Sequence, residues 1–221
     1  MTSPGVLAAM QLADSAFPSG AFAYSWGLEA ALADGRVDRR GFAAWLKAEM
    51  LGRWASFDRV SLAMAHRAAE AGGDPADVDR EIDLAFWAEP LRARSAEAGQ
   101  AFLSAAARLG DGAALALREA ALAGEAPGHL PAAQGAVFCS MGLDLALALA
   151  ASAHGAAQSL ASAAVRLSLI GALDAQRALI ALRPALAEAA GPPPPDQRPA
   201  AFSPLAEIAQ LRPPPDRLFI N

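Results

Sequence analysis

The feature that most limits the fold is a long run without charge. No Asp, Glu, Lys or Arg occurs between Asp144 and Arg166. A helix of that length could cross a bilayer, but the run is mostly alanine and contains histidine, glutamine and several serines. Charged residues flank it at helical spacing. We therefore predict two buried helices without a membrane span, one ending near Ser152 and the next running from about Ala156 to Ile170.

Composition gives the fold class. The hydrophobic fraction is 54%, largely from alanine and leucine, whereas isoleucine, valine, tyrosine and threonine are scarce. Alanine and leucine favour helices and the scarce residues favour strands, so we expect an all-α fold. Glycine and proline divide the apolar periodic stretches into about eight to ten helices that form a single-domain bundle.

One periodic stretch predicts an especially long helix. Phe42, Leu46, Met50 and Trp54 recur every four residues, so the stripe favours a helix from an N-cap at Asp38 to about residue 66. The tryptophan is interpreted as core packing. Further helices are predicted over residues 75–88, 91–109, 111–124, 132–140 and 174–190.

Charge and cysteine content exclude several protein classes. The formal net charge of −5 argues against a nucleic-acid-binding protein, which needs a basic face. The single cysteine, Cys139, cannot form an internal disulfide and fits a reducing compartment, so we expect a cytoplasmic protein. Residues 1–11 have neither a basic segment nor a long apolar run, so no signal peptide is predicted.

The stretch from Asp14 to Glu29 is the least interchangeable part of the chain. Phe17-Pro18-Ser19-Gly20 has the residues of a turn, because proline fixes φ and glycine can take a positive φ. From Phe22 onward the apolar spacing predicts a helix that carries Tyr24 and Leu28 on one stripe. Gly27 would lie inside that helix at a cost of about 1 kcal/mol, so it needs a packing or contact reason.

No enzyme signature is visible in the sequence. Glycine-rich phosphate-binding runs and Gly-x-Ser-x-Gly are absent, and Ser25 has no nearby base. Asp14 and Glu29 could form an acid–base pair, although a carboxylate at a helix end is the commoner explanation. His129 and Cys139 could meet only through folding, so ordinary loop and core roles are favoured over a metal site.

Arg166 is the most informative isolated charge. It closes the uncharged run in apolar surroundings, where a charge is usually paired internally or held for a partner. An internal ion pair with Asp144 or Glu29 and a contact with a partner protein are equally good explanations.

Proline marks the C-terminal end of the helical part. Pro192 to Pro195 cannot continue a helix, so we predict a helical domain over residues 1–191 and a Pro-rich, partly flexible tail over residues 192–221. The tail could contain one more short helix, from Ser203 to Leu211. Its apolar end suggests docking on the same chain or on a partner.

Several motifs together resemble the UreF family of urease accessory proteins. The N-terminal stretch matches that family's Pro-x-Gly-x-Phe-x-x-Ser-x-Gly-Leu-Glu run, and Ala164-x-Arg166-Leu167 followed by Gly171 and Gln176 is similar to its second signature. Further matches run in the same order along the chain, at Arg94, Gly99, Gln100, Gly135, Gly142 and the terminal Arg217-Leu218-Phe219. The chain departs from the family in its Ile220-Asn221 ending and in Pro213-Pro214-Pro215.

The resemblance implies a non-enzymatic, all-α scaffold. It implies a homodimer that joins UreD (also called UreH) and recruits the GTPase UreG to the urease apoprotein, so that GTP hydrolysis is coupled to nickel delivery. No catalytic residue, cofactor or metal ligand is expected in this chain. The expected UreD contact is Arg217, Leu218 and Phe219. The expected GTPase-facing or dimer-facing surface comprises Asp14, Phe17, Pro18, Gly20, Tyr24, Ser25, Glu29, Arg166 and Gln176.

Two other functions remain open at this point. One is an all-α small-molecule enzyme that uses Asp14, Ser25 and Glu29 in a cleft. The other is a helical ligand-binding regulator, against which the net charge of −5 and the absence of a basic recognition helix count.

Overall fold

The chain folds into the all-α bundle that its composition predicts. The computed structural model describes residues 3–14, 16–18, 25–86 and 88–200, and within them every regular element is helical. The helices in chain order are α1 (Pro4–Ala13), α2 (Leu28–Ala33), α3 (Phe42–Glu49), the π-helical η2 (Met50–Asp58), α4 (Arg59–Glu70), α5 (Pro75–Ala85), α6 (Glu89–Arg108), α7 (Gly112–Leu122), α8 (Leu130–Ser140), α9 (Leu145–Arg166) and α10 (Ala172–Ala189).

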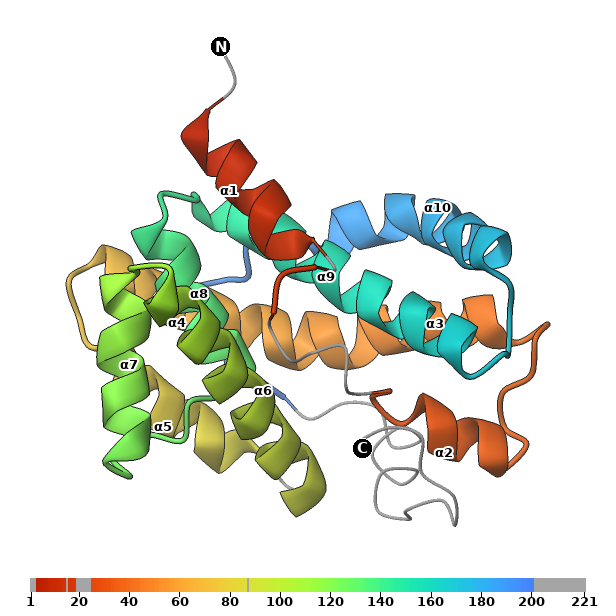
Figure 1. Ribbon diagram of the computed structural model, residues 1–221, viewed down its shortest axis with the longest axis horizontal. Coiled ribbons are helices and arrows are strands. Elements are labelled where there is room, and N and C mark those ends of the chain that lie inside the picture. The colour runs from red at the N-terminus through yellow and green to blue at the C-terminus, as the bar shows by residue number, and fades with distance from the viewer. Residues whose placement is uncertain (1–2, 15, 19–24, 87, 201–221) are drawn as a thin grey trace.

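Helices α4 and α8 form the most extensive helix pair of the bundle. Gly135 lies in the middle of α8, and a Cβ placed on it would lie 2.6 Å from the carbonyl oxygen of Leu62 and 2.8 Å from the backbone nitrogen of His66. The glycine therefore lets the two backbones approach almost to contact. Helix α6 packs on α8 from the other side, with α7 beside it (Figure 1).

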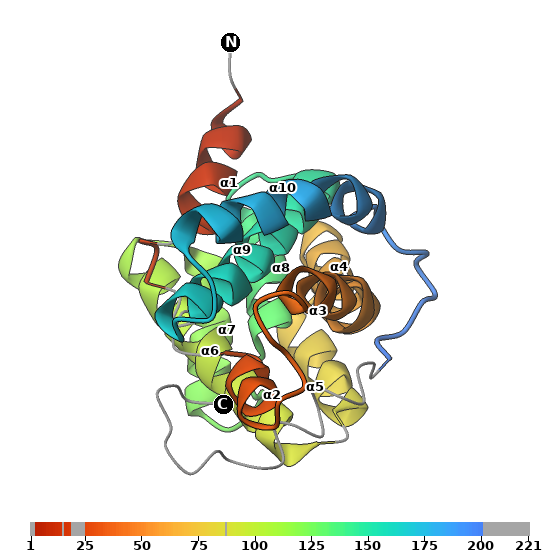
Figure 2. The same cartoon turned by 90° about the vertical axis from the view of Figure 1, so that its right-hand side faces the viewer.

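The apolar core has two main parts that meet along α9. The first lies beneath α2, α3, η2 and α10 and contains Leu46 and Trp54. The second lies between α1, α6, α7 and α8, where the Phe102 ring packs against Phe17 and Phe138 at centroid distances of 5.5 and 6.1 Å. Helix α10 runs over α9 on the side of the bundle where α1 projects (Figure 2). None of the helices in the described residues combines the length and the apolar character that a membrane span requires.

The uncharged run forms one helix and not two, so the predicted break after Ser152 is wrong. Asp144 caps the N-terminus of α9 by accepting a hydrogen bond from the Leu147 backbone nitrogen at 2.8 Å, and the helix continues unbroken to Arg166. Gly155 lies inside it. Burial of the alanine-rich face outweighs the propensity cost of one interior glycine, which is about 1 kcal/mol.

The predicted long helix is present, with two differences. It begins at Phe42, because Asp38 accepts a hydrogen bond from the Gly41 backbone nitrogen at 2.6 Å in a turn just before the helix. It also changes to a π-helix over Met50–Asp58 before α4 resumes the ordinary α-helical path. Short π-helical segments often lie at functional sites.

Gly27 does not lie inside a helix, so that prediction is also wrong. Its φ of 87° and that of Trp26, 51°, place both residues in the left-handed region, directly before α2. A glycine is therefore needed here for its backbone conformation and not for close packing within a helix. The helix predicted from Phe22 starts only at Leu28 in the part of the chain that is described.

The first residues of the predicted flexible tail lie against the bundle. After α10 ends at Ala189, the carbonyls of Gly191 and Pro193 accept hydrogen bonds from Arg59 and Arg67 of α4, Pro193 is buried, and Ala200 is hydrogen-bonded to Ser56 of η2. The short helix predicted over 203–211 and the terminal Arg217, Leu218 and Phe219 lie outside the described residues.

Candidate functional site

The N-terminal stretch is partly exposed and partly built into the core. Asp14 ends α1 on the surface, where its carboxylate accepts a hydrogen bond from the Ala16 backbone nitrogen at 2.7 Å. Pro18 is also exposed, whereas the Phe17 ring is buried against Phe102. The turn at this point thus places the Phe17 ring in the core and leaves Asp14 and Pro18 exposed to solvent.

Ser25 and Glu29 lie at the start of α2, and both are buried. The Ser25 hydroxyl accepts a hydrogen bond from the Glu29 backbone nitrogen at 3.5 Å, and the Glu29 carboxylate lies in the first turn, where the helix dipole favours negative charge. These two residues support the stretch from inside. Gly20 and Tyr24, which the sequence analysis also places on this surface, lie outside the described residues.

The π-helical segment supplies an arginine that the sequence analysis did not select. The Arg53 guanidinium stacks over the Trp26 ring at 4.3 Å and forms an ion pair with Asp58 at 2.8 Å. Residues five apart face the same side when a helix widens to i→i+5 hydrogen bonding, so η2 brings this pair together. Burial raises the pKa of Asp58, and the charge of Arg53 opposes that rise.

Next to this ion pair lies a small, partly open pocket of about 60 Å³, between η2, α6, α8 and α9. The indole nitrogen of Trp54 donates to the Ser152 hydroxyl at 3.3 Å, and that hydroxyl donates to the side-chain oxygen of Gln134 at 2.9 Å. A polar chain therefore lines one wall, while Phe102 and Leu130 are among the apolar residues of the others. Asp14 borders the pocket on the side of the N-terminal stretch.

Arg166 and Gln176 are exposed on α9 and α10, whose buried faces share the first core with α2. The structure reduces the candidates for an internal ion pair of Arg166. Asp144 lies at the opposite end of the 22-residue helix α9, which at 1.5 Å per residue is about 33 Å long. An ion pair between Arg166 and Asp144 is therefore impossible.

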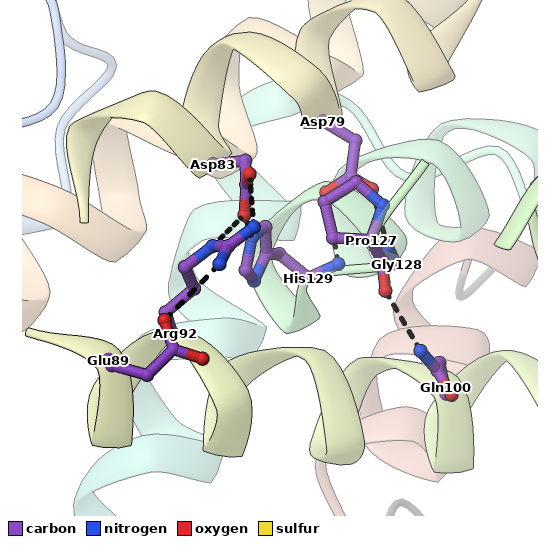
Figure 3. A network of polar contacts seen from close by, with 8 residues as sticks. All are labelled: Asp79, Asp83, Glu89, Arg92, Gln100, Pro127, Gly128 and His129. Atoms are coloured by element: carbon purple, nitrogen blue, oxygen red, sulfur yellow. Dashed lines mark hydrogen bonds and ion pairs between the residues drawn. The ribbon is translucent and has the colours of Figure 1, made fainter. Parts of the chain in front are cut away.

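A second polar site lies at the junction of α5, α6 and the loop before α8 (Figure 3). Asp79 on α5 is fully buried and accepts hydrogen bonds from the backbone nitrogens of Gly128 and His129 at 2.5 and 2.9 Å. Burial raises the pKa of Asp79, while His129 and the two backbone donors oppose that rise. The carboxylate thus fixes the loop by satisfying main-chain donors that would otherwise be buried without a partner.

One turn further along α5, Asp83 joins this loop to α6. It accepts two hydrogen bonds from the Arg92 guanidinium, at 2.6 and 2.8 Å, and its carboxylate lies 2.9 Å from the His129 Nε2 (Figure 3). A carboxylate only accepts, so Nε2 carries the proton. Hydrogen bonding from Arg92 is the main cause that lowers the pKa of Asp83, followed by His129 against the opposing effect of burial.

The same loop packs tightly on α6. A Cβ on Gly99 would lie only 2.0 Å from the carbonyl oxygen of Gly128, and the Gln100 side chain donates to the Pro127 carbonyl at 3.0 Å. The sequence signals for this site were Asp79 and Asp83 at i and i+4 and the Pro-Gly-His triplet. Neither signal shows by itself that segments about fifty residues apart meet, which is why the sequence analysis missed the network.

The side chains of this network contact one another and the backbone of the loop, so the network has the geometry of a structural site and not of a catalytic site. Asp79 accepts hydrogen bonds from the backbone nitrogens of Gly128 and His129, and Asp83 contacts the side chains of both Arg92 and His129. Among the residues that the structure describes, no three His, Cys, Asp or Glu side chains are grouped so that they could hold a metal ion. His129 lies in the loop directly before α8 and is buried, whereas Cys139 lies within α8 and is only half-buried.

Comparison with known proteins decides the family. The sequence profile of the UreF family matches residues 37–183. The chain belongs to the UreF family. It is 39% identical over 203 residues to the urease accessory protein UreF of a Rhodopseudomonas palustris strain, covering 86% of this chain and 84% of that protein.

Two further relatives carry the same name. The urease accessory protein UreF of Cereibacter sphaeroides is 36% identical over 191 residues, which cover 85% of this chain and 83% of that protein. The UreF of Bradyrhizobium diazoefficiens is 38% identical over 181 residues, covering 79% of this chain and 73% of that protein. The family resemblance given by the sequence motifs is thus confirmed, and the chain is a urease accessory protein by family.

Proposed function

We propose that this protein acts as a non-enzymatic scaffold in the maturation of urease. In this proposal it recruits the GTPase UreG to UreD and apo-urease in the cytoplasm and couples GTP hydrolysis to nickel delivery. Membership of the UreF family is the single observation that carries the proposal. Among the described residues, the buried Asp79 carboxylate holds the loop before α8, and Asp58 pairs with Arg53 within η2, so both carboxylates serve the fold.

Direct contact with the GTPase or with a second copy would come from the exposed members of the predicted surface, Asp14, Pro18, Arg166 and Gln176. Phe17, Ser25 and Glu29 are buried and would act by holding the exposed residues of this surface in place. Gly20 and Tyr24 remain proposed contacts of the same surface. A homodimer is part of the proposal, and light scattering on the purified chain would test it.

The proposed UreD contact is the end of the tail, Arg217, Leu218 and Phe219. An aromatic residue buried at the centre of an interface contributes about 2 kcal/mol or more, so Phe219→Ala should greatly reduce co-purification with UreD. Leu122→Ala is a matched control, because Leu122 is an apolar side chain that is 69% exposed on α7, elsewhere on the surface. Equal recovery of UreD with both variants would show that the tail is not the contact.

The GTPase-facing surface needs a separate experiment. Asp14→Ala combined with Arg166→Ala should lower the amount of UreG retained in the presence of nickel and GTP, without loosening UreD. If the double variant lost UreD binding and kept UreG binding, Asp14 and Arg166 would not belong to the GTPase-facing surface. Turnover of a small-molecule substrate by the purified chain would contradict the non-enzymatic part of the proposal.

A further inference from the structure

The segment after α10 is attached to the bundle at both of its ends. We call residues 191–200 the strap; in Figure 2 it runs downward from the end of α10. At its start, Arg59 donates from Nη1 to the Gly191 carbonyl at 2.8 Å, and Arg67 donates from Nη2 to the Pro193 carbonyl at 2.6 Å. Proline has no N–H, so its carbonyl is the main-chain group through which such a segment is held.

The far end of the strap pairs with the π-helical segment. The backbone nitrogen of Ala200 donates to the Ser56 carbonyl at 3.1 Å, and the Ser56 hydroxyl donates to the Ala200 carbonyl at 3.0 Å. Ser56 lies within η2, and Arg59 is the first residue after it. The strap is therefore held by residues that lie in the widened part of the helix or directly after it.

The Arg59 side chain occupies the carbonyl that an ordinary α-helix would use. In an α-helix the backbone nitrogen of residue 59 would bond to the carbonyl of residue 55, four positions back. In this structure it bonds to the Trp54 carbonyl, five positions back, and the Ala55 carbonyl accepts a hydrogen bond from the Arg59 Nε at 2.9 Å. The guanidinium therefore supplies the donor that the π-helical register takes away from Ala55.

One guanidinium thus joins the strap to the register of the helix. Its Nε holds the Ala55 carbonyl and its Nη1 holds the Gly191 carbonyl, so the strap fixes the direction of the side chain that replaces the α-helical hydrogen bond. Arg59 is half-buried, so water competes less for these two hydrogen bonds than it would at an exposed site.

The same register decides which side chains meet inside the bundle. Arg53 and Asp58 are five positions apart, which places them about 140° apart around an α-helix but close to the same side of a π-helix. Their ion pair at 2.8 Å and the stacking of Arg53 over Trp26 at 4.3 Å therefore depend on the π-helical form. Through Trp26 the register affects the chain directly before α2.

We propose that Arg59 is a latch that couples attachment of the strap to the π-helical register of η2. In one state the strap is held, the register is π-helical and Arg53 stacks on Trp26. In the other the strap is released, the register is α-helical and this stacking is lost. Coupling of this kind is reciprocal, so a partner that stabilises the contact of Arg53 with Trp26 also tightens the strap. The latch operates in the free chain and does not depend on the proposed scaffold function.

The test measures which carbonyl the backbone nitrogen of residue 59 is bonded to. Scalar couplings across hydrogen bonds in the isotope-labelled, full-length chain identify the acceptor. We expect Trp54 in wild type and Ala55 in Arg59→Met, which keeps the apolar stem and removes the guanidinium. Arg67→Met is the matched control and should keep Trp54, because Arg67 holds the strap at Pro193 but lies about two turns further along α4. Thermal unfolding checks that both variants are folded.

Two further readouts follow the coupling to either side of the helix. In Arg59→Met the indole NMR signal of Trp26 should shift, because Arg53 leaves its ring. Amide hydrogen exchange at Ala200 should become about tenfold faster, because the Ser56 carbonyl moves with the register. In Arg67→Met the Trp26 signal should keep its wild-type position.

Each result has a definite consequence. Ala55 as the acceptor in wild type, or Trp54 as the acceptor in Arg59→Met, would overturn the latch. If the acceptor switched while Trp26 or Ala200 kept its wild-type value, the coupling to that side would be wrong. Arg59→Lys, which keeps the charge but lacks the forked guanidinium, takes the place of Arg59→Met if that variant does not fold.

Discussion

Gly135→Ala tests the closest helix contact of the bundle. The added methyl group would lie 2.6 Å from the Leu62 carbonyl oxygen and 2.8 Å from both the Ala65 Cβ and the His66 backbone nitrogen. These are atoms of the interior of α4, so they can move away only if the whole helix shifts. A shift would also strain the hydrogen-bonding contact between the His66 Nε2 and the Leu143 carbonyl, which is 2.8 Å long.

The magnitude follows from two opposing effects. Alanine improves helix propensity over glycine by about 1 kcal/mol, whereas forcing a methyl group into a packed helix interface costs about 1–3 kcal/mol and occasionally more. Contacts below 3 Å with two backbone atoms and with the Ala65 Cβ place this site at the upper end of that range. We therefore expect Gly135→Ala to lower the free energy of unfolding by about 2 kcal/mol net.

Gly155→Ala is the matched control. Gly155 lies inside α9, and apart from the neighbouring backbone of that helix no heavy atom lies within 4 Å of the position that its Cβ would take. The gain in propensity is then unopposed, so this variant should be more stable than wild type by up to about 1 kcal/mol. Urea unfolding followed by far-UV circular dichroism and tryptophan fluorescence measures both values. Equal stabilisation by the two substitutions would refute the packing argument.

Three other predictions concern single side chains. Asp79→Ala leaves two buried backbone donors without an acceptor, but it also removes a carboxylate that is costly to bury. We expect the free energy of unfolding in urea to fall by about 2 kcal/mol net. An unfolding midpoint equal to that of wild type would contradict the role of Asp79 in holding the loop. The pKa of Asp83 is lowered in the folded state. The stability that Asp83 contributes is therefore fully present above the ordinary carboxyl pKa of 3.8 and is lost as the pH falls through the lower pKa of the folded state. Unfolding titrated with acid should therefore show a shallower loss of stability in Asp83→Asn than in wild type, and parallel curves would show that the pairing with Arg92 does not affect stability. Phe17→Ala removes a buried ring from Phe102 and should cost about 3 kcal/mol by thermal or urea unfolding, whereas a cost below about 1 kcal/mol would place that ring outside the core.

Local signals predicted most helix ends. Asp74 with Pro75 and Asp111 each begin a helix where the sequence indicates, because a side-chain oxygen accepts a backbone hydrogen bond in the first turn. Asp144 also caps α9, a start that was not predicted although the same type of signal was present. Such caps join residues two or three positions apart, so the sequence alone is sufficient to locate them.

Features that depend on distant packing were not predictable. The widening of the helix at η2 and the continuity of α9 through Gly155 are decided by what surrounds those helices and not by their own periodicity. The network of Asp79 and His129 and the attachment of the strap at Ser56 join segments far apart in the chain. Among the predicted surface residues, burial of Phe17 and Glu29 could not be read from local pattern either.

The central claim is that this chain is a scaffold for urease maturation, and one reconstitution tests it most directly. Apo-urease, UreD, UreG, nickel and GTP are mixed with and without the purified chain, and urease activity is then measured. We expect that activity rises only when the chain is present and that the chain alone turns over no substrate. Full activation without the chain would contradict the account.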